Sequence, residues 1–505
     1  MYPKEESVRM QWALLSVWDK TGLAGLAGAL RDHGVSILAS GGTGKVLGEA
    51  GIGFVEISLY TGSPEMMDGR VKTLHPKIHA GLLGRRGVDD GVMEDRGIHP
   101  IDLLVANLYP FERMSSQGLP LPELMEFVDV GGPAMIRAAA KNYRDVAVVV
   151  DPADYPLATA ALERGGFTAD ERLALAKKAF ARTAAYDAAI SNHLHGLGVP
   201  LPQVYTLQAR NGRTLRYGEN PHQNGAVYGE EGIAGAVPLQ GREMSYNNYL
   251  DLDAAVALLR EFDDTCAVCV KHNNPCGVAT GNDLRDVYIS AREVDPDSSY
   301  GGIVALNRPV TGPVAEEICR TYIEVVIAPS FTADALRIFR GKEKMRVLAL
   351  PEPAMMGGIA LRSIDGGYLV QKTPPYTEHW KVVTERDPTA GELQALRLAW
   401  KVCKHARSNA IVFAGPDRAI GIGAGQTSRV DAARIAVMKA RSSLAGSAVA
   451  SDAFLPFPDT LEEAAKAGAT SLVQPGGSIR DREVIEAANR LDVAMIFTGV
   501  RHFRH

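Results

Sequence analysis

The sequence lacks several features that would place it in a specialised class of protein. It has five cysteines in 505 residues, too few for a disulfide framework, which favours a reducing compartment such as the cytoplasm. No apolar run reaches the ~18–20 residues of a membrane span. The opening residues, MYPKEESVRMQW, contain no apolar core of a secretory signal. We therefore expect a cytoplasmic protein without a membrane partner.

The sequence also lacks a large excess of positive or negative charge. The net charge is −5, which argues against a nucleic-acid-binding surface spread over the whole protein. Hydrophobic residues make up 46% and charged residues 22% of the chain, as in ordinary globular proteins. The length is sufficient for two or more domains with sizeable cores. The composition therefore favours small-molecule partners over nucleic acid.

Two nucleotide-binding fingerprints are missing. Ala39 and Val46 stand where a Walker A motif needs Gly and Ser or Thr, and no G-x-G-x-x-G fingerprint is present, which disfavours a dehydrogenase. Ser40–Thr43 nevertheless follows a predicted strand and opens a helix, where backbone N–H groups and the helix dipole favour an anion. The residues alone support a phosphate site and a plain tight turn equally.

Short apolar runs alternate with helical patterns over roughly the first 150 residues. This alternation predicts an α/β fold with a doubly wound parallel sheet. In such sheets ligands bind at the carboxyl ends of the strands. The predicted strands are Trp12–Val17, Val35–Ala39, Phe54–Ile57, Leu103–Asn107 and Val146–Val150, and the first helices are about Gly22–His33 and Thr43–Ala50.

A capping box at Thr168–Glu171 predicts a helix that extends to about Leu194. Its pattern places Leu173, Ala176 and Phe180 near one face. The segment after this helix predicts a domain boundary near residue 205. We therefore expect one domain over 1–205 and a second over 206–505, whose Gly-rich joints predict two sub-domains.

Potentially reactive side chains are most concentrated in Thr265–Gly277, where three cysteines and one histidine suggest a zinc site at first sight. Cys266 and Cys269 are three positions apart in a run of strand type, so their side chains should point to opposite faces. A zinc deaminase would need H-x-E and P-C-x-x-C signatures, and this segment has neither. We therefore expect buried structural thiols and no catalytic metal.

Several basic groups have two possible interpretations. His272, at the end of this buried strand, follows Lys271, whose charge would favour the neutral, proton-accepting histidine. A solvated lysine beside a packed histidine is the other interpretation. Lys141 is either a surface lysine or a functional amine, and Arg70 belongs either to a phosphate site or to a solvated loop. The last five residues, Arg501–His505, would ordinarily fray.

Ordered segments of the first half resemble the inosine monophosphate (IMP) cyclohydrolase domain. They are SVWDKTG, ASGGTGK, GRVKTLHPKIHAG, ANLYPF and DVGGPAMIRAAAKN. The resemblance implies a fold like that of methylglyoxal synthase and Lys141 as the acid/base residue. It also implies ligand binding by Asp19, Lys20, Ser40, Gly41, Gly42, Thr43, Arg70, Lys72, Thr73, Asn107, Tyr109, Asp129 and Val130. Trp18 departs from the family pattern, which usually has serine there, and a bulky indole changes the contacts expected at the phosphate.

Seven segments over residues 206–505 resemble the aminoimidazole-carboxamide ribonucleotide (AICAR) formyltransferase family. They are LRYGENPHQ, KHNNPCG, KHARSNAIVF, GIGAGQTSR, SDAFLPFPD, QPGGSIRD and TGVRHFRH. The resemblance implies tandem cytidine-deaminase-like sub-domains, with His272 as the base and with Lys271 and Asn409 as charge-stabilising groups. It implies nucleotide binding by Arg216, Tyr217, Gly301, Arg429 and Arg501, and contacts to the folate or substrate by Phe454, Asp459, Ser478 and Ile479.

Together the two halves resemble the bifunctional family of purine biosynthesis. The second half would transfer a formyl group from 10-formyltetrahydrofolate to the 5-amino group of AICAR, giving formyl-AICAR (FAICAR). The first half would close the ring to IMP with loss of water. The resemblance also implies a homodimer with the transfer sites between subunits. The alternatives are a formyltransferase whose cyclohydrolase is impaired by Trp18, and a non-catalytic purine nucleotide sensor.

Overall fold

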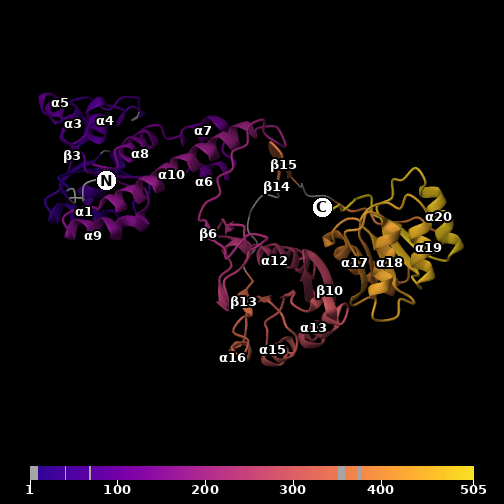
Figure 1. Cartoon of the computed structure of the whole chain (residues 1–505). Coiled ribbons are helices and arrows are strands. Elements are labelled where there is room, and N and C mark those ends of the chain that lie inside the picture. Colours follow the sequence, from indigo (N-terminus) through magenta and orange to yellow (C-terminus); the bar gives the residue numbers. More distant parts are fainter. Residues whose placement is uncertain (1–8, 40, 68–69, 351–358, 373–376) are drawn as a thin grey trace. The chain divides into compact units, whose positions relative to one another are not determined.

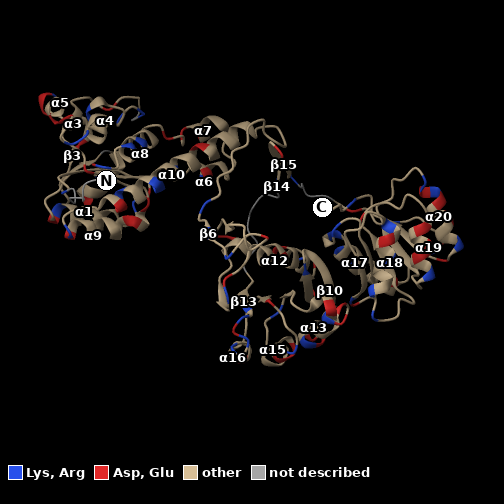
Figure 2. Ribbon diagram, in the orientation of Figure 1, with Lys and Arg blue, Asp and Glu red and all other residues tan. Residues whose placement is uncertain are grey.

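The computed structural model describes residues 9–39, 41–67, 70–350, 359–372 and 377–505. These residues form two compact units, one up to Gln208 and the other from Ala209 to His505 (Figure 1). Lys and Arg are interspersed with Asp and Glu in both units (Figure 2). Among the described helices, none combines the length and the apolar character that crossing a membrane requires.

The first unit is built on a parallel sheet. Its strands are β1 Trp12–Ser16, β2 Ser36–Ala39, β3 Val55–Glu56, β4 Leu103–Ala106 and β5 Ala147–Val149. They lie in the order β3-β2-β1-β4-β5, and every neighbouring pair is parallel. The chain order reverses between β1 and β4, which is where a doubly wound sheet opens a crevice beyond its strand ends. The predicted α/β class and the five strands are confirmed.

Helices cover both faces of this sheet because successive strand residues point to opposite sides. Leu15 and Val105 pack with α1 and α9 on one face, whereas Leu14 and Leu104 pack with α4, α8 and α10 on the other. The helices are α1 Leu23–Asp32, α2 Gly41–Glu49, α3 Ile57–Thr61, α4 Pro76–Leu83, α5 Asp90–Asp95, α6 Phe111–Ser115, α7 Leu121–Met125, α8 Gly131–Lys141, α9 Tyr155–Glu163 and α10 Ala169–His195, with a short 3₁₀ helix at Pro152–Asp154.

The long helix α10 confirms the predicted capping box. The Thr168 side chain accepts a hydrogen bond from the backbone of Glu171, and the Glu171 carboxylate accepts one from the backbone of Thr168. The predicted face is partly wrong, because Phe180 is 40% exposed whereas Leu175 and Ala179 are buried. The Phe180 ring instead lies beside a surface guanidinium.

The second unit contains two mixed sheets. The strands of the first are β8 Pro238–Gln240, β9 Thr265–Lys271, β10 Asn274–Gly281, β11 Ile303–Leu306, β12 Val325–Ala328 and β13 Arg346–Ala349; those of the second are β16 Lys381–Val382, β17 Ile411–Ala414, β18 Ala419–Gly423, β19 Ala448–Ser451, β20 Ser471–Gln474 and β21 Ala494–Phe497. The orders are β10-β9-β11-β12-β13-β8 and β18-β17-β19-β20-β21-β16. In these orders, both sheets have two antiparallel pairings, then two parallel pairings and then one antiparallel pairing. The sheets therefore repeat one topology.

Helices and two small hairpins complete this unit. The hairpins are formed by β6 Arg213–Thr214 with β7 Ala226–Val227, and by β14 Ile359–Ile364 with β15 Gly367–Lys372. The helices are α11 Gly232–Gly235, α12 Tyr246–Leu259, α13 Leu284–Arg292, α14 Pro296–Ser299, α15 Gly312–Cys319, α16 Ala333–Phe339, α17 Ala390–His405, α18 Arg429–Lys439, α19 Asp459–Lys466 and α20 Asp481–Arg490. Helices α12 and α17 share one core with the inner faces of both sheets.

The two sheets meet at their edge strands β10 and β18. The backbone N–H of Thr280 donates to the carbonyl of Asp417 at 2.7 Å, and the local pairing is antiparallel. Because the strands run in opposite directions, the start of β10 at Asn274 lies toward the end of β18 at Gly423. The turn after β9 and the loop after β18 therefore share one side of the unit.

Two candidate active sites

In the first unit, loops from three neighbouring strands meet at the carboxyl edge of the sheet. Asn107, which follows β4, accepts hydrogen bonds from the backbone N–H groups of Trp18 and Asp19 at 2.6 and 2.9 Å. Its side-chain amide donates to the Asp19 carbonyl at 3.1 Å. The predicted residues Asp19 and Asn107 are thus held together, as the strand order β1-β4 requires.

The start of α2 has the character of an anion cradle. Gly41 has a positive φ of 50°, and a Cβ there would lie 2.7 Å from the Lys72 Nζ. At Gly42 the Lys20 Nζ would lie 4.0 Å from such a Cβ. Two ammonium groups therefore converge on the first turn of a helix, where unpaired N–H groups favour an anion. Ser40 lies outside the described residues.

Lys20 is held in place by the residue after β1 and by the helix α2. Its Nζ donates to the Val17 carbonyl and lies 3.4 Å from the Thr43 Oγ1. The Thr43 hydroxyl is itself bonded to the backbone of Val17. Burial lowers the pKa of Lys20, and the charge of Asp19 opposes this effect. A partly desolvated ammonium of this kind interacts strongly with an anion that excludes water.

The start of α8 borders this cradle. A Cβ at Gly131 would lie 2.4 Å from the Thr73 Oγ1, so the Thr73 hydroxyl touches the first turn. The Asp129 carboxylate accepts a hydrogen bond from the Gly132 N–H at 2.8 Å. Burial raises the pKa of Asp129, against backbone hydrogen bonds from Gly132 and Tyr109. A carboxyl group with a raised pKa is a candidate for proton transfer.

Trp18 contacts this group, whereas three predicted residues, Arg70, Val130 and Lys141, lie at the surface. Arg70 forms an exposed ion pair with Glu126. Val130 is exposed. Trp18 turns its ring toward Tyr109, at 5.0 Å between ring centroids. Lys141 is exposed at the last position of α8, about 15 Å along the helix from Gly131 at 1.5 Å per residue. The structure therefore does not bring Lys141 to this group of residues.

In the second unit, Lys271 and His272 stand at the turn between β9 and β10. His272 and Asn273 both have a positive φ, 52° and 61°. Their backbone N–H groups donate to the two carboxylate oxygens of Asp251 on α12, at 3.3 and 2.6 Å. Burial raises the pKa of Asp251, against the hydrogen bonds from Asn273 and His272. Sequence reasoning missed Asp251, since no motif marks a single carboxylate on a helix.

The predicted residue Gly301 lies next to Lys271. The Lys271 Nζ donates to the Tyr300 carbonyl at 2.7 Å and would lie 3.9 Å from a Cβ at Gly301. The Gly301 N–H donates to the Tyr322 carbonyl at 2.7 Å. The end of β9 and the starts of β11 and β12 thus form one continuous edge.

Arg216 and Tyr217 belong to a charged cluster. The Arg216 guanidinium lies 5.0 Å from the centre of the Tyr217 ring. Burial lowers the pKa of the nearby Arg346. The negative charge of Glu324 opposes this shift, and the positive charge of Arg216 adds to it. The Glu324 carboxylate also accepts from the Asn248 amide at 3.0 Å. Glu324 was missed by sequence reasoning for the same reason as Asp251.

A cavity of about 440 Å³ lies where the two sheets meet, and Lys271, His272, Asn274 and Gln426 are among its lining residues. The Asn274 side chain accepts from the Arg407 N–H at 2.9 Å. Asn409 donates twice to the Gln426 carbonyl, from its backbone N–H at 3.0 Å and its side chain at 2.8 Å. The antiparallel edge strands therefore bring the Asn409 segment of one repeat to the Lys271–His272 turn of the other.

The C-terminal residues are anchored, so the ordinary expectation of fraying is wrong here. The backbone N–H of His502 donates to the Asp452 carbonyl at 2.9 Å. The buried Asp452 carboxylate binds Arg429 at 3.2 Å. The guanidinium groups of Arg429 and Arg501 lie 5.7 and 4.3 Å from the Phe503 ring. Phe503, close to the chain terminus, therefore contacts two arginines that are predicted to bind the nucleotide.

The four residues predicted to contact folate or substrate lie in two segments that follow strands of the second sheet. Phe454 follows β19, and Asp459 is the first residue of α19. Ser478 follows β20 and donates its backbone N–H to Asp481 at 3.1 Å, while Ile479 is fully exposed. Because β19 and β20 are parallel neighbours, both segments lie at the same edge of the sheet.

The cysteines of β9 and β10 divide between two cores. Cys266 faces the core shared with α12 and α17, whereas Cys269 and Cys276 face the opposite core, as the strand pattern predicts. Burial raises the pKa of the Cys276 thiol to about 12. In the described part of the chain, no group of three or more His, Cys, Asp or Glu residues is arranged to hold a metal ion.

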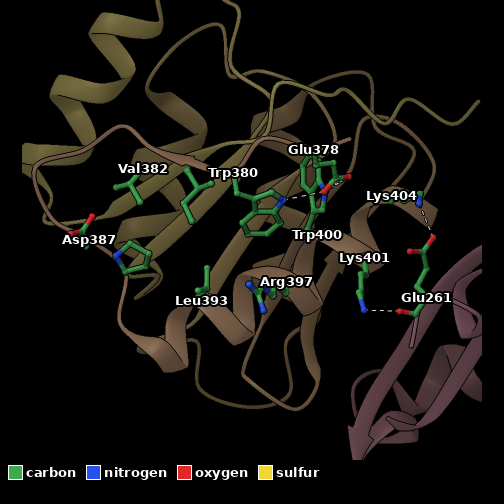
Figure 3. A pocket seen from close by; sticks show the side chains of 12 residues that line it. Glu261, Glu378, Trp380, Val382, Asp387, Leu393, Arg397, Trp400, Lys401 and Lys404 are labelled. Atoms are coloured by element: carbon green, nitrogen blue, oxygen red, sulfur yellow. Dashed lines mark hydrogen bonds and ion pairs between the residues drawn. The ribbon is translucent and has the colours of Figure 1, made fainter. Parts of the chain in front are cut away.

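A larger cavity, about 690 Å³, lies beside α17 and was not anticipated from the sequence (Figure 3). Trp380, Leu393 and Arg397 are among its lining residues. The indoles of Trp380 and Trp400 each donate to Glu378 at 3.0 Å. This wall is therefore fixed by hydrogen bonds to a single carboxylate.

Comparisons with known proteins match both units. A model of the MGS-like domain matches residues 22–134, and a model of the AICARFT/IMPCHase bienzyme matches residues 139–439. Proteins named "Bifunctional purine biosynthesis protein PurH" are similar over 98% of this chain: 49% identical in Sorangium cellulosum and 46% in Bacillus cereus, each covered to 99%. The protein of that name from Myxococcus xanthus is 50% identical over 98% of this chain and 100% of its own length.

Proposed function

This chain belongs to the family of bifunctional AICAR formyltransferase/IMP cyclohydrolase enzymes, and we propose that each unit carries one of the two reactions. In the second unit, 10-formyltetrahydrofolate gives its formyl group to the 5-amino group of AICAR, which forms FAICAR. In the first unit, the carboxamide nitrogen of FAICAR attacks the formyl carbon, and loss of water gives IMP. The observation that carries the transfer site is the cavity at which Lys271, His272 and the Asn409 segment meet.

The amine of AICAR needs a general base, because the neighbouring carboxamide withdraws its electrons. We assign this role to His272, which lines the cavity. A general base typically contributes ~10²–10⁴-fold to a rate. Lys271 and Asn409 would stabilise charge on the formyl oxygen and on the folate amine as it leaves. The fixed position of the Lys271 amine, 2.7 Å from the Tyr300 carbonyl, supports this assignment.

Substrate binding in the transfer site follows from the surrounding charges. Arg216, Tyr217 and Gly301 would hold the nucleotide from the first repeat, and Arg429 and Arg501 would hold it from the second. Folate contacts would come from the segments after β19 and β20, which contain Phe454, Asp459, Ser478 and Ile479; Asp459 and Ile479 are exposed. We further propose a cytoplasmic homodimer, in which a second copy covers such exposed residues. Sedimentation equilibrium of the purified enzyme tests this assembly, and a monomer at all concentrations would contradict it.

Ring closure in the first unit needs a phosphate anchor, donors for a transient oxyanion and a proton carrier. The anchor is assigned to Lys20, to Lys72, which also pairs with Glu65 at 3.0 Å, and to the first turn of α2, which both ammonium groups approach. Asn107, Tyr109 and Thr73 would line the base. The acid/base role of Lys141 rests on the family resemblance, whereas Asp129 lies within the group and has a raised pKa.

The decisive assay supplies AICAR and 10-formyltetrahydrofolate to the purified protein and follows IMP formation. We expect His272→Ala to lose formyl transfer by at least about 100-fold, as a general base requires, while it still cyclises supplied FAICAR. The two activities should separate because they lie in different units. Loss of both activities in a folded His272→Ala protein would contradict two separate sites. Binding of AICAR and IMP without turnover would favour a nucleotide sensor instead.

A further inference from the structure

Trp18 lies at the entrance to the proposed ring-closing site. It comes two positions after β1, and its backbone N–H is bonded to the Asn107 side chain at 2.6 Å. The next two residues are Asp19 and Lys20, and Lys20 lies at the anion cradle. The main chain of Trp18 is thus fixed between the loops that follow β1 and β4.

The indole of Trp18 joins two other rings. Its centroid lies 5.0 Å from that of Tyr109, at an interplanar angle of 62°. It lies 6.4 Å from that of Phe127, at 80°. Edge-to-face contacts at these distances are favourable for aromatic rings. The three rings come from separate loops and make one aromatic cluster.

This cluster is not closed into the core. Trp18 is 49% exposed and Tyr109 is 39% exposed. Trp18 precedes Lys20, whose ammonium lies at the phosphate cradle, by two residues, and Tyr109 donates a backbone hydrogen bond to the Asp129 carboxyl. An exposed indole beside an anion site matches the two ends of a nucleotide, since flat bases stack on aromatic rings.

We propose that Trp18 is a base-stacking residue of the ring-closing site, with its indole packed on the heterocycle of the bound purine nucleotide. This inference rests on the proposed function of the first unit. The two lysines and the first turn of α2 supply the contacts to the phosphate, and Trp18 supplies affinity for the base. Trp18 therefore strengthens nucleotide binding at this site.

Intrinsic tryptophan fluorescence of the full chain tests the proposal, because the sequence has four tryptophans. Titration of the wild-type protein with IMP should quench its emission. Trp18→Phe should lose this quenching and keep most of the affinity, since a phenyl ring still stacks. Trp18→Ser should bind IMP on the order of tenfold more weakly, as loss of one stacked ring predicts. Trp12→Phe is the matched control, because the Trp12 ring stacks on His99 at 4.4 Å between ring centroids. The Trp12→Phe protein should retain the quenching by IMP.

Unchanged quenching and affinity in both Trp18 variants would overturn the stacking role. The proposed ring closure would still stand if these variants and the wild type cyclise FAICAR equally well. Failure of the wild-type protein to bind IMP or to cyclise FAICAR would instead overturn the proposed function and the stacking role together. Failure of Trp18→Ser to fold would leave Trp18→Phe to decide, since it retains a ring against Tyr109 and Phe127.

Discussion

His272 and Asn273 occupy left-handed backbone conformations, which are uncommon for residues other than glycine. Asp251, which is half-buried, offsets their cost by accepting both backbone N–H groups. The turn therefore holds its shape in the absence of a glycine, and its shape decides where the His272 ring points. At the scale of single residues, the proposed base is positioned by a carboxylate on another element.

Asp251→Asn should slow formyl transfer by about tenfold or more. The asparagine amide would present an N–H group to a backbone N–H of the turn. A buried donor without a partner costs ~1–3 kcal/mol, and this half-buried site should cost part of that. We expect kcat to fall more than KM for AICAR, because the turn would be displaced while the nucleotide contacts remain. Steady-state kinetics of both reactions measures this effect, with FAICAR cyclisation as an internal control.

The matched control is Asp253→Asn on the same helix, since Asp253 is exposed. Its transfer rate should equal that of the wild type. Equal transfer rates for Asp251→Asn and the wild type would exclude the positioning role.

At the scale of elements, the two sheets of the second unit use the same close packing of a helix on an edge strand. A Cβ at Gly277 in β10 would lie 1.9 Å from the Ala291 carbonyl of α13. A Cβ at Gly423 in β18 would lie 1.9 Å from the Ala432 carbonyl of α18. Glycine lets the helix backbone approach the strand directly at both positions. This packing fixes the edge strands that border the transfer cavity.

Gly423→Ala should destabilise the second unit, because the new methyl group meets a backbone carbonyl that cannot rotate away. Overpacking of this kind costs about 1–3 kcal/mol. Urea unfolding should therefore show a lower midpoint. Gly391→Ala in the first turn of α17 is the control, since nothing lies within 4 Å of its Cβ, and it should not lower the midpoint. A Gly423→Ala protein as stable as the wild type would disprove the close approach.

At the scale of the whole second unit, Glu378 ties the C-terminal residues to α17. Its carboxylate accepts from Trp380, Trp400 and His502, at 3.0, 3.0 and 2.9 Å. Burial by itself would raise the pKa of Glu378, but these hydrogen bonds outweigh it and lower the pKa to about 2. One carboxylate thereby joins residues more than 120 positions apart, since the contact from Glu378 to His502 spans 124 positions.

Glu378→Gln should destabilise the unit at pH 7 and reduce its sensitivity to acid. The wild-type carboxylate has a lowered pKa, so its contribution is complete above its ordinary value of 4.5 and is lost as pH falls toward 2. The difference in unfolding free energy between the two proteins should therefore shrink between pH 7 and pH 3. Denaturant unfolding at both pH values measures this difference, with the exposed Glu385→Gln as control. A difference that is equal at both pH values would contradict the ionised contact.

The sequence by itself determined the local elements and the chemistry they carry. Alternating strand and helix patterns located the five strands of the first sheet, because periodicity reflects which side chains are buried. The capping box at Thr168 located the start of α10, because a cap depends on residues three positions apart. The ordered motifs also indicated the bifunctional family. These signals are short in sequence and need no knowledge of the remaining chain.

Only the tertiary structure decided which distant groups meet. Asp251 and Glu324 carry no motif, and they join the transfer site because α12 and β12 border the same edge. Lys141 and Gly131 share one helix, yet its length separates them. The anchored C-terminus and the ring partners of Trp18 likewise depend on contacts between segments far apart in the chain. Such contacts arise from packing, whose geometry is set by the whole fold rather than by neighbouring residues.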